Sequence, residues 1–90
     1  MSEAQRTVEV TNKRGLHARA SAKFVTLAAS LPAQVEVEKD GARVVGTSIM
    51  GLMMLGAAKG DTIVISASGD GAEEAVQALT ALVEARFNEE

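Results

Sequence analysis

The chain contains no cysteine, tryptophan or tyrosine, and its 90 residues include one histidine, one proline and two phenylalanines. Without cysteine it has no disulfides, no thiol nucleophile and no thiolate metal ligand, and one histidine leaves carboxylates to complete a zinc site. We therefore expect neither a metal nor a cofactor. The net charge of −3 and the scarcity of aromatic side chains also argue against a nucleic-acid-binding protein, which uses a basic surface and aromatic side chains that stack on bases.

The length and the apolar runs limit the organisation of the chain. Ninety residues are enough for one domain, spanning 1–90, to bury a core without disulfides or a metal. No apolar run approaches the roughly 20 residues of a membrane span, and the first residues lack the basic and apolar regions of a signal peptide. We expect a cytoplasmic monomer that does not insert into membranes and whose partners are proteins.

Hydrophobic periodicity predicts the order β-α-β-β-α-β-α. Alternating residues predict strands, Asp40-Gly41 predicts a two-residue hairpin turn, and apolar stripes predict helices. The last helix is expected to start in a capping box formed by Asp70 and Glu73, and the Glu89-Glu90 tail to fray. The strands are expected at 7–11, 35–38, 43–45 and 62–67, and the helices from 18, over 49–55 and from 70. This predicts an α+β open-faced sandwich, a four-stranded antiparallel sheet with three helices on one face and 62–67 at its centre.

The start of the first helix breaks an electrostatic rule. The apolar stripe of Ala20, Phe24, Leu27, Ala28 and Leu31 predicts that the helix begins near His17. Acidic side chains are favoured in a first turn, and basic ones cost about 0.3–1 kcal/mol each. This first turn instead carries Arg19. A bound or covalently attached anion at this end would compensate for the unfavourable charge.

The residues around His17 permit a structural and a chemical interpretation. A lone histidine is more often structural than catalytic. Together with Arg19 and the free N–H groups of Ala18 and Arg19, however, it makes a nucleophile beside an anion cradle. Gly15 is interpreted either as a turn glycine or as a place where a partner's backbone approaches. The neighbouring basic residues are expected to be solvated or to steer acidic partners, and they are Lys13, Arg14 and Lys23.

A short apolar helix follows Ser48, which is a suitable N-cap. Leu52 is the expected core residue of this helix. All of its methionines cannot face inward on two turns, although periodicity alone favours core over surface. Methionine is adaptable at surfaces that meet several partners, and the candidate docking residues are Ile49, Met50 and Met53.

Two motifs, Asn-Lys-Arg-Gly-Leu-His-Ala-Arg at 12–19 and Ser-Ile-Met-Gly-Leu-Met at 48–53, resemble those of the histidine-containing phosphocarrier (HPr) family of the bacterial phosphoenolpyruvate-dependent phosphotransferase system. The resemblance spans nearly the whole chain. It implies that enzyme I phosphorylates His17 on Nδ1, that a IIA-type acceptor then takes the phosphoryl group, and that Arg19 stabilises it. It also implies that Ile49, Met50 and Met53 dock partners, and that Ser48 is a site for a serine kinase or phosphorylase.

One position departs from the family pattern. The family usually has proline after the arginine, and this chain has Ala20. Alanine is an equally good helix former and adds an N–H donor, so the chemistry should survive. The change leaves a nitrogen-branch regulatory phosphocarrier open beside one in sugar transport. A non-catalytic interaction module that uses Met50 and Met53 is the alternative from another class; as a carrier, the chain would not be a turnover enzyme.

Overall fold

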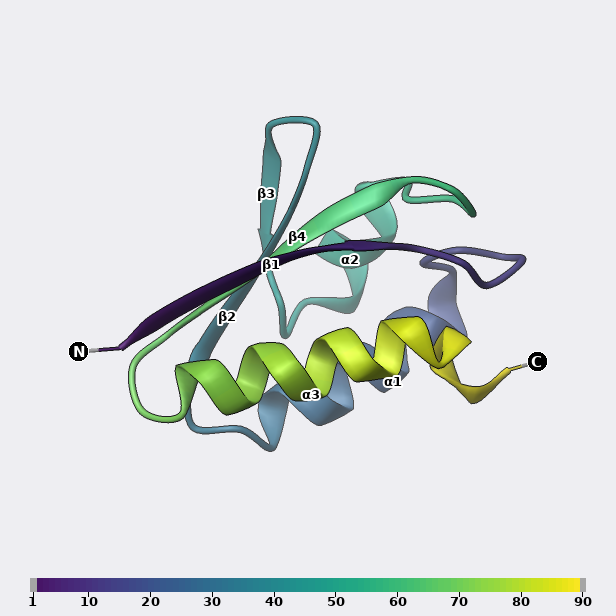
Figure 1. Cartoon of the computed structure of the whole chain (residues 1–90). Coiled ribbons are helices and arrows are strands. Elements are labelled where there is room, and N and C mark those ends of the chain that lie inside the picture. The colour runs from purple at the N-terminus through teal and green to yellow at the C-terminus, as the bar shows by residue number, and fades with distance from the viewer. Residues whose placement is uncertain (1, 90) are drawn as a thin grey trace.

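The computed structural model describes residues 2–89 and confirms the predicted order of elements. The strands form one antiparallel sheet in the order β1-β4-β2-β3, and the helices lie on one of its faces (Figure 1). The open-faced sandwich is therefore confirmed, as is the interior position of β4. The elements are β1 (Glu3–Glu9), α1 (Ala18–Ala29), β2 (Gln34–Lys39), β3 (Ala42–Val45), α2 (Ile49–Met54), β4 (Thr62–Ser68), α3 (Ala72–Glu84) and a short turn, η1 (Arg86–Asn88).

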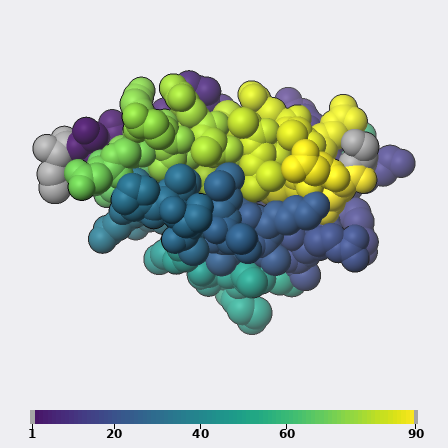
Figure 2. All heavy atoms as spheres, turned by 90° about the horizontal axis from the view of Figure 1, so that it is seen from below, coloured from purple at the N-terminus to yellow at the C-terminus, as the bar shows by residue number. Residues whose placement is uncertain are grey.

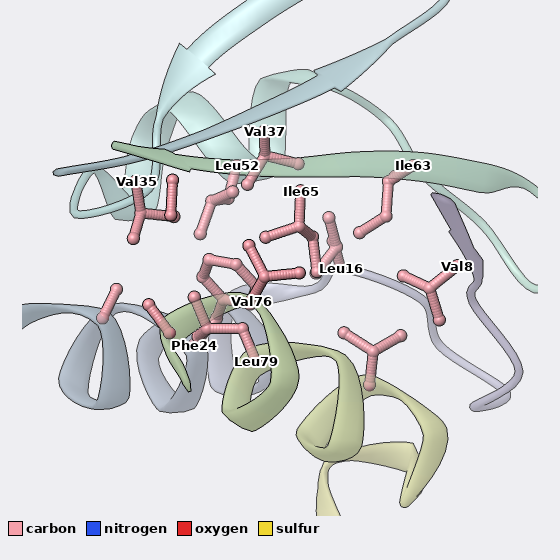
Figure 3. Close-up of a cluster of buried hydrophobic side chains, with 14 of the residues drawn as sticks. Val8, Leu16, Phe24, Val35, Val37, Leu52, Ile63, Ile65, Val76 and Leu79 are labelled. Carbon is pink, nitrogen blue, oxygen red and sulfur yellow. The ribbon is translucent and has the colours of Figure 1, made fainter. Parts of the chain in front are cut away.

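The alternation of apolar residues in the strands places one face of the sheet against the helices. Ile63 and Ile65 of β4 are fully or almost fully buried, and they pair with Val8 of β1 and Val37 of β2. These side chains point towards α1 and α3, where they meet Phe24 (Figure 3). The inward-facing side chains of the strands and the apolar stripes of the helices thus form one apolar layer between the sheet and the helices.

The Asp40-Gly41 hairpin is confirmed. Lys39 and Ala42 lie opposite each other at the ends of β2 and β3, and the two residues between them have φ values of 51° and 86°. Positive φ at both central positions is the backbone of a type I′ turn, one of the two common two-residue hairpin turns.

Strand β1 is longer at its start than the sequence predicts. It covers Glu3–Glu9 instead of 7–11, because it pairs with β4 from Glu3 opposite Ser68 to Glu9 opposite Thr62. Only Val8 of this edge strand is fully covered by the core, so its first residues carry little apolar alternation for the sequence to show.

The stripe predicted for α1 is confirmed at Ala20, Phe24 and Ala28, whereas Leu27 is only partly buried, and Leu31, also partly buried, lies beyond the end of the helix. Ser21, which the stripe does not include, is fully buried as well. Its hydroxyl donates a hydrogen bond of 3.1 Å to a backbone carbonyl in the preceding turn, which offsets the cost of burying a polar group.

The capping box predicted for α3 is wrong. The N-cap is Gly71, which has a φ of 72° and no side chain to cap the helix, and Asp70 lies before it. A left-handed residue turns the chain sharply into the helix, a geometry that the Asp70 and Glu73 pattern does not show. The acidic first turn is present nevertheless, with Glu73 and Glu74 near the positive end of the helix dipole.

The chain that follows α3 folds back over the helical layer. Phe87, in η1, is fully buried, and the end of the chain lies at the same end of the molecule as the loop between β1 and α1 (Figure 1). Figure 2 shows this C-terminal segment in yellow against the first helix. The predicted fraying is therefore wrong for Glu89, which is hydrogen-bonded to Asn12 and His17. Glu90 lies outside the described residues. Within residues 2–89, no helix has the length and apolar character that crossing a membrane requires.

Candidate functional site

The loop between β1 and α1 is held against the loop that precedes β4. Leu16 N–H donates to the carbonyl of Ala57 at 2.9 Å, and Gly15 has a φ of 63°. A Cβ added to Gly15 would lie 2.3 Å from that carbonyl oxygen. The space at Gly15 is thus filled by the chain's own backbone, and this close approach fixes where His17 begins the helix.

His17 is the N-cap of α1, as its place in the sequence suggests. Its Nδ1 accepts a hydrogen bond of 3.3 Å from the backbone N–H of Arg19, and Ser21 N–H bonds its carbonyl. Ala18 and Arg19, the predicted cradle residues, are the first two residues of the helix, where backbone N–H groups have no partner in the helix itself. The first turn has no acidic residue, which confirms the unusual charge of this helix start.

The other ring nitrogen of His17 faces a carboxylate. The Nε2 atom lies 2.6 Å from Oε2 of Glu89, and the two side chains are only 19% and 14% exposed. The Nδ2 group of the fully buried Asn12 donates to Oε1 of Glu89 at 3.1 Å and to the carbonyl of Gly15 at 2.9 Å. The contact therefore belongs to a network that joins two distant parts of the chain.

This network keeps Glu89 ionised. Burial acts to raise the pKa of the Glu89 carboxyl, but hydrogen bonds from His17 and Asn12 outweigh it and hold that pKa below its usual value. The nearby positive charge of Lys23 acts in the same direction. Near neutral pH the oxygen that faces His17 is therefore a hydrogen-bond acceptor and not a donor.

Basic side chains surround this pair in a shallow basin of about 500 Å³, lined by Lys13, Arg14, His17, Arg19, Lys23, Asn88 and Glu89. Lys23 is not simply solvated, as the sequence suggested, because its ammonium donates to the carbonyl of Phe87 at 2.6 Å. The exposed side chain of Arg19 forms no ion pair with any residue that the structure describes. Its charge is thus available to an incoming anion.

The short helix α2 has one buried and one exposed side. Ser48 caps it, with Oγ accepting the N–H of Gly51 at 2.9 Å, and Leu52 is fully buried; both predictions are confirmed. Met50 and Met54 are 69% and 79% exposed. We use the term apolar patch for the exposed large apolar residues in and before α2: Val45, Ile49, Met50, Met53 and Met54. The patch includes the three predicted docking residues and adds Val45 and Met54.

Sequence reasoning missed Asn12 and Glu89. Asn12 reads as an ordinary turn residue, and Glu89 as part of a charged tail. One signal was present: Phe87 is an isolated aromatic residue beyond the last helix, and an apolar residue in a polar tail indicates that the tail is anchored.

The arrangement is suited to chemistry at an anion. It combines an imidazole, a backbone N–H donor, a guanidinium without an ion pair among the described residues, and a carboxylate within hydrogen-bond distance of the ring. Among the described residues, no group of three or more His, Asp or Glu side chains is placed to hold a metal ion.

Comparison with known proteins gives consistent matches. A family model described as "PTS HPr component phosphorylation site" matches residues 4–85. The chain is 48% identical over 85 residues to phosphocarrier protein HPr of Neisseria meningitidis, covering 94% of this chain and 96% of that protein. It is 37% identical over 89 residues to phosphocarrier protein NPr of Shewanella violacea, covering 99% and 98%. The crystal structure of HPr-C-His from Thermoanaerobacter tengcongensis is similar, with a TM-score of 0.90, 48% identity and coverage of 100% and 99%.

Proposed function

Because this chain belongs to the HPr family and is a phosphocarrier of the phosphotransferase system, we propose that it accepts a phosphoryl group from enzyme I on His17 and passes it to a IIA-type acceptor. The observation that carries this proposal is the position of His17. It caps a helix whose first turn has a basic and no acidic side chain, and its Nδ1 faces a backbone N–H.

Phosphoryl transfer requires mainly that the protein position the reacting atoms and stabilise the negative charge of the phosphoryl group. Phosphoryl transfer proceeds by in-line displacement with charge spread over the phosphoryl oxygens. Nδ1 of His17 is the nucleophile, and the N–H of Ala18 with the Arg19 guanidinium are the donors for those oxygens. The N–H of Arg19, which bonds Nδ1 in the free ring, becomes a further donor once Nδ1 is bonded to phosphorus. The site is shallow, so the bound phosphoryl group stays accessible to the acceptor protein.

The apolar patch is the proposed docking surface for enzyme I and for the acceptors. Methionine side chains adapt their shape, and one carrier must meet several partners in turn. The chain acts as a monomer in this proposal, since each partner must reach both the patch and His17.

Incubation with phosphoenolpyruvate and purified enzyme I tests the proposal. Intact-protein mass spectrometry should show the gain of one phosphoryl group, which acid treatment removes and which His17→Ala abolishes. No gain in mass, or a gain that persists in His17→Ala, would contradict the assignment to His17. A non-catalytic interaction module would instead keep all partner-dependent activity in His17→Ala.

The nitrogen-branch regulatory phosphocarrier is the second candidate. Ala20 replaces the proline that is usual in the family, and the match to phosphocarrier protein NPr covers 99% of this chain. The two candidates share enzyme-I-type phosphorylation and differ in the acceptor. Transfer from the phosphorylated carrier to a sugar-type IIA domain and to a nitrogen-type IIA domain, measured side by side, decides between them.

A further inference from the structure

We propose that Glu89 is a positioning residue, which holds the imidazole of His17 in the tautomer that leaves Nδ1 free to attack phosphorus. The contact that carries this inference is the 2.6 Å hydrogen bond between Nε2 of His17 and Oε2 of Glu89. The inference rests on the proposed function for its kinetic consequence. Its structural part, the control of the tautomer, holds or fails independently of any partner.

The two neighbours of the ring define its tautomer. A neutral imidazole has one N–H donor and one acceptor nitrogen. The carboxylate of Glu89 only accepts, so Nε2 must carry the proton. The N–H of Arg19 only donates, so Nδ1 must carry the lone pair. The two contacts agree, and together they leave Nδ1 as the only nucleophilic nitrogen of the ring.

The transfer step balances with the proton left in place. The lone pair of Nδ1 forms the new P–N bond while the bond between phosphorus and the donor atom of enzyme I breaks, and the donor atom keeps that electron pair. The His17 ring gains positive character and retains the proton on Nε2. The ionised Glu89 stabilises this charge without moving, as a carboxylate does behind the histidine of a catalytic triad.

The segment that carries Glu89 is anchored for this contact. Phe87 is fully buried, the ammonium of Lys23 bonds the Phe87 carbonyl at 2.6 Å, and Asn12 holds the second oxygen of Glu89. The three residues of η1 have φ values of 56°, 54° and 59°. Non-glycine residues avoid this left-handed region, so three in succession persist only where contacts fix the chain.

Three variants of the full chain separate positioning from general effects. Glu89→Ala removes the carboxylate, and Glu89→Gln retains an acceptor oxygen without the charge. Glu84→Ala is the matched control, because it removes one carboxylate from an exposed position at the end of α3. Nitrogen-15 NMR of the His17 ring identifies which nitrogen is protonated and needs no partner protein.

In the wild type and in Glu84→Ala we expect the neutral ring to be protonated on Nε2 alone, and in Glu89→Ala to show both tautomers. With enzyme I, Glu89→Ala should lower kcat by about tenfold, by analogy with metal-ligating histidines, for which loss of the orienting partner costs about 10–100-fold. The KM should stay within about twofold, because Glu89 is not in the apolar patch. Glu89→Gln should fall between the wild type and Glu89→Ala.

Identical ring spectra in Glu89→Ala and Glu84→Ala would overturn the inference, as would an unchanged kcat in Glu89→Ala. A changed spectrum in a chain whose wild type accepts no phosphoryl group would contradict the proposed function while supporting control of the tautomer. The two failures are thus distinguishable.

Discussion

Gly15 shows how one backbone position fixes the site. Its positive φ and its close approach to Ala57 both exclude a side chain. Gly15→Ala should destabilise the protein by more than about 1 kcal/mol, since alanine at positive φ is strained and here it also meets a carbonyl oxygen. Urea unfolding measures the loss. Gly56→Ala is the matched control, because its φ of 65° is similar and no atom lies within 4 Å of its Cβ position. Equal losses in the two variants would mean that the contact with Ala57 contributes nothing.

Arg19 can be tested without disturbing the fold, because its side chain is exposed. Arg19→Glu should slow phosphoryl transfer in both directions, since a carboxylate repels the phosphoryl oxygens that the guanidinium attracts. Arg19→Lys should restore only part of the rate, because a point charge lacks the planar fork of donors. Rapid-quench kinetics with enzyme I measure the effect. Arg14→Glu, a charge reversal in the same basin, is the control, and a wild-type rate in Arg19→Glu would refute the anion cradle.

Glu89 should make stability depend on pH. Its pKa in the folded protein lies below the reference value of 4.5 because of its contacts with His17 and Asn12, and the charge of Lys23 adds to this. A lowered pKa contributes stability that is fully present above the unfolded value and is lost as the pH falls through the folded one. The difference in unfolding free energy between wild type and Glu89→Gln should therefore be smaller below about pH 4.5 than near neutral pH. Urea unfolding across this range checks it; a difference that grew on acidification would reverse the sign.

The residues of the site differ in how far the sequence could predict them. His17, Ala18 and Arg19 lie in one helix turn, so local patterns of charge and capping were sufficient to single them out. Glu89 contacts His17 across 72 positions of sequence. No local pattern encodes such a contact, because the path of the chain after α3 depends on where the core accepts Phe87.

At the scale of elements, α2 combines a cap with a contact surface, and Ser48 separates the two roles. Ser48→Ala should lose about 0.5–2 kcal/mol, whereas Ser48→Asp should cost little because aspartate is a good N-cap. The effect on phosphorylation by enzyme I should be the reverse, small for Ser48→Ala and large for Ser48→Asp. A carboxylate beside Ile49 should raise the KM of the carrier for enzyme I, and a phosphate on Ser48, which we propose as a regulatory modification, should act likewise.

Thermal unfolding and enzyme-I-dependent phosphorylation of both Ser48 variants make this test. Thr47→Asp is a control for charge, because the residue precedes the N-cap and lies outside the apolar patch. Equal phosphorylation kinetics in wild type and Ser48→Asp would leave Ser48 with its capping role alone.

The elements were predictable where their own residues determine them. The hairpin depends on Asp40-Gly41, and β4 on its β-branched residues, so both follow from the sequence. The exposed side of α2 was ambiguous, because periodicity alone favoured its burial. The structure leaves it exposed, since a helix of six residues turns only one side, that of Leu52, towards the core. The cap of α3 was missed because it uses the backbone of Gly71 and no side chain.

At the scale of the whole molecule, the sheet contains strand pairs that are neighbours in the sequence and strand pairs that are far apart in it. The hairpin joins β2 and β3 through two residues, whereas β1 pairs with β4 from Glu3 opposite Ser68. Closing a long loop costs more conformational entropy than closing a short one. We expect the hairpin and β4 to associate before β1 joins the sheet.

This order makes a kinetic prediction for two buried valines. Val37→Ala in β2 should slow folding, because its contacts form before the transition state, whereas Val8→Ala in β1 should mainly speed unfolding. Stopped-flow chevron plots measure both rates. A larger effect of Val8→Ala than of Val37→Ala on the folding rate would reverse the proposed order.

The strand order also affects when the site forms during refolding. The loop that ends in His17 follows β1 directly, and its position depends on the pairing of β1 with β4. A refolding chain can therefore be compact, with a formed hairpin and a partly assembled sheet, while its histidine has not yet met Glu89. Phosphoryl-accepting activity should accordingly return with the slowest folding phase and not with the first collapse, so that the population of active carrier reports on complete folding.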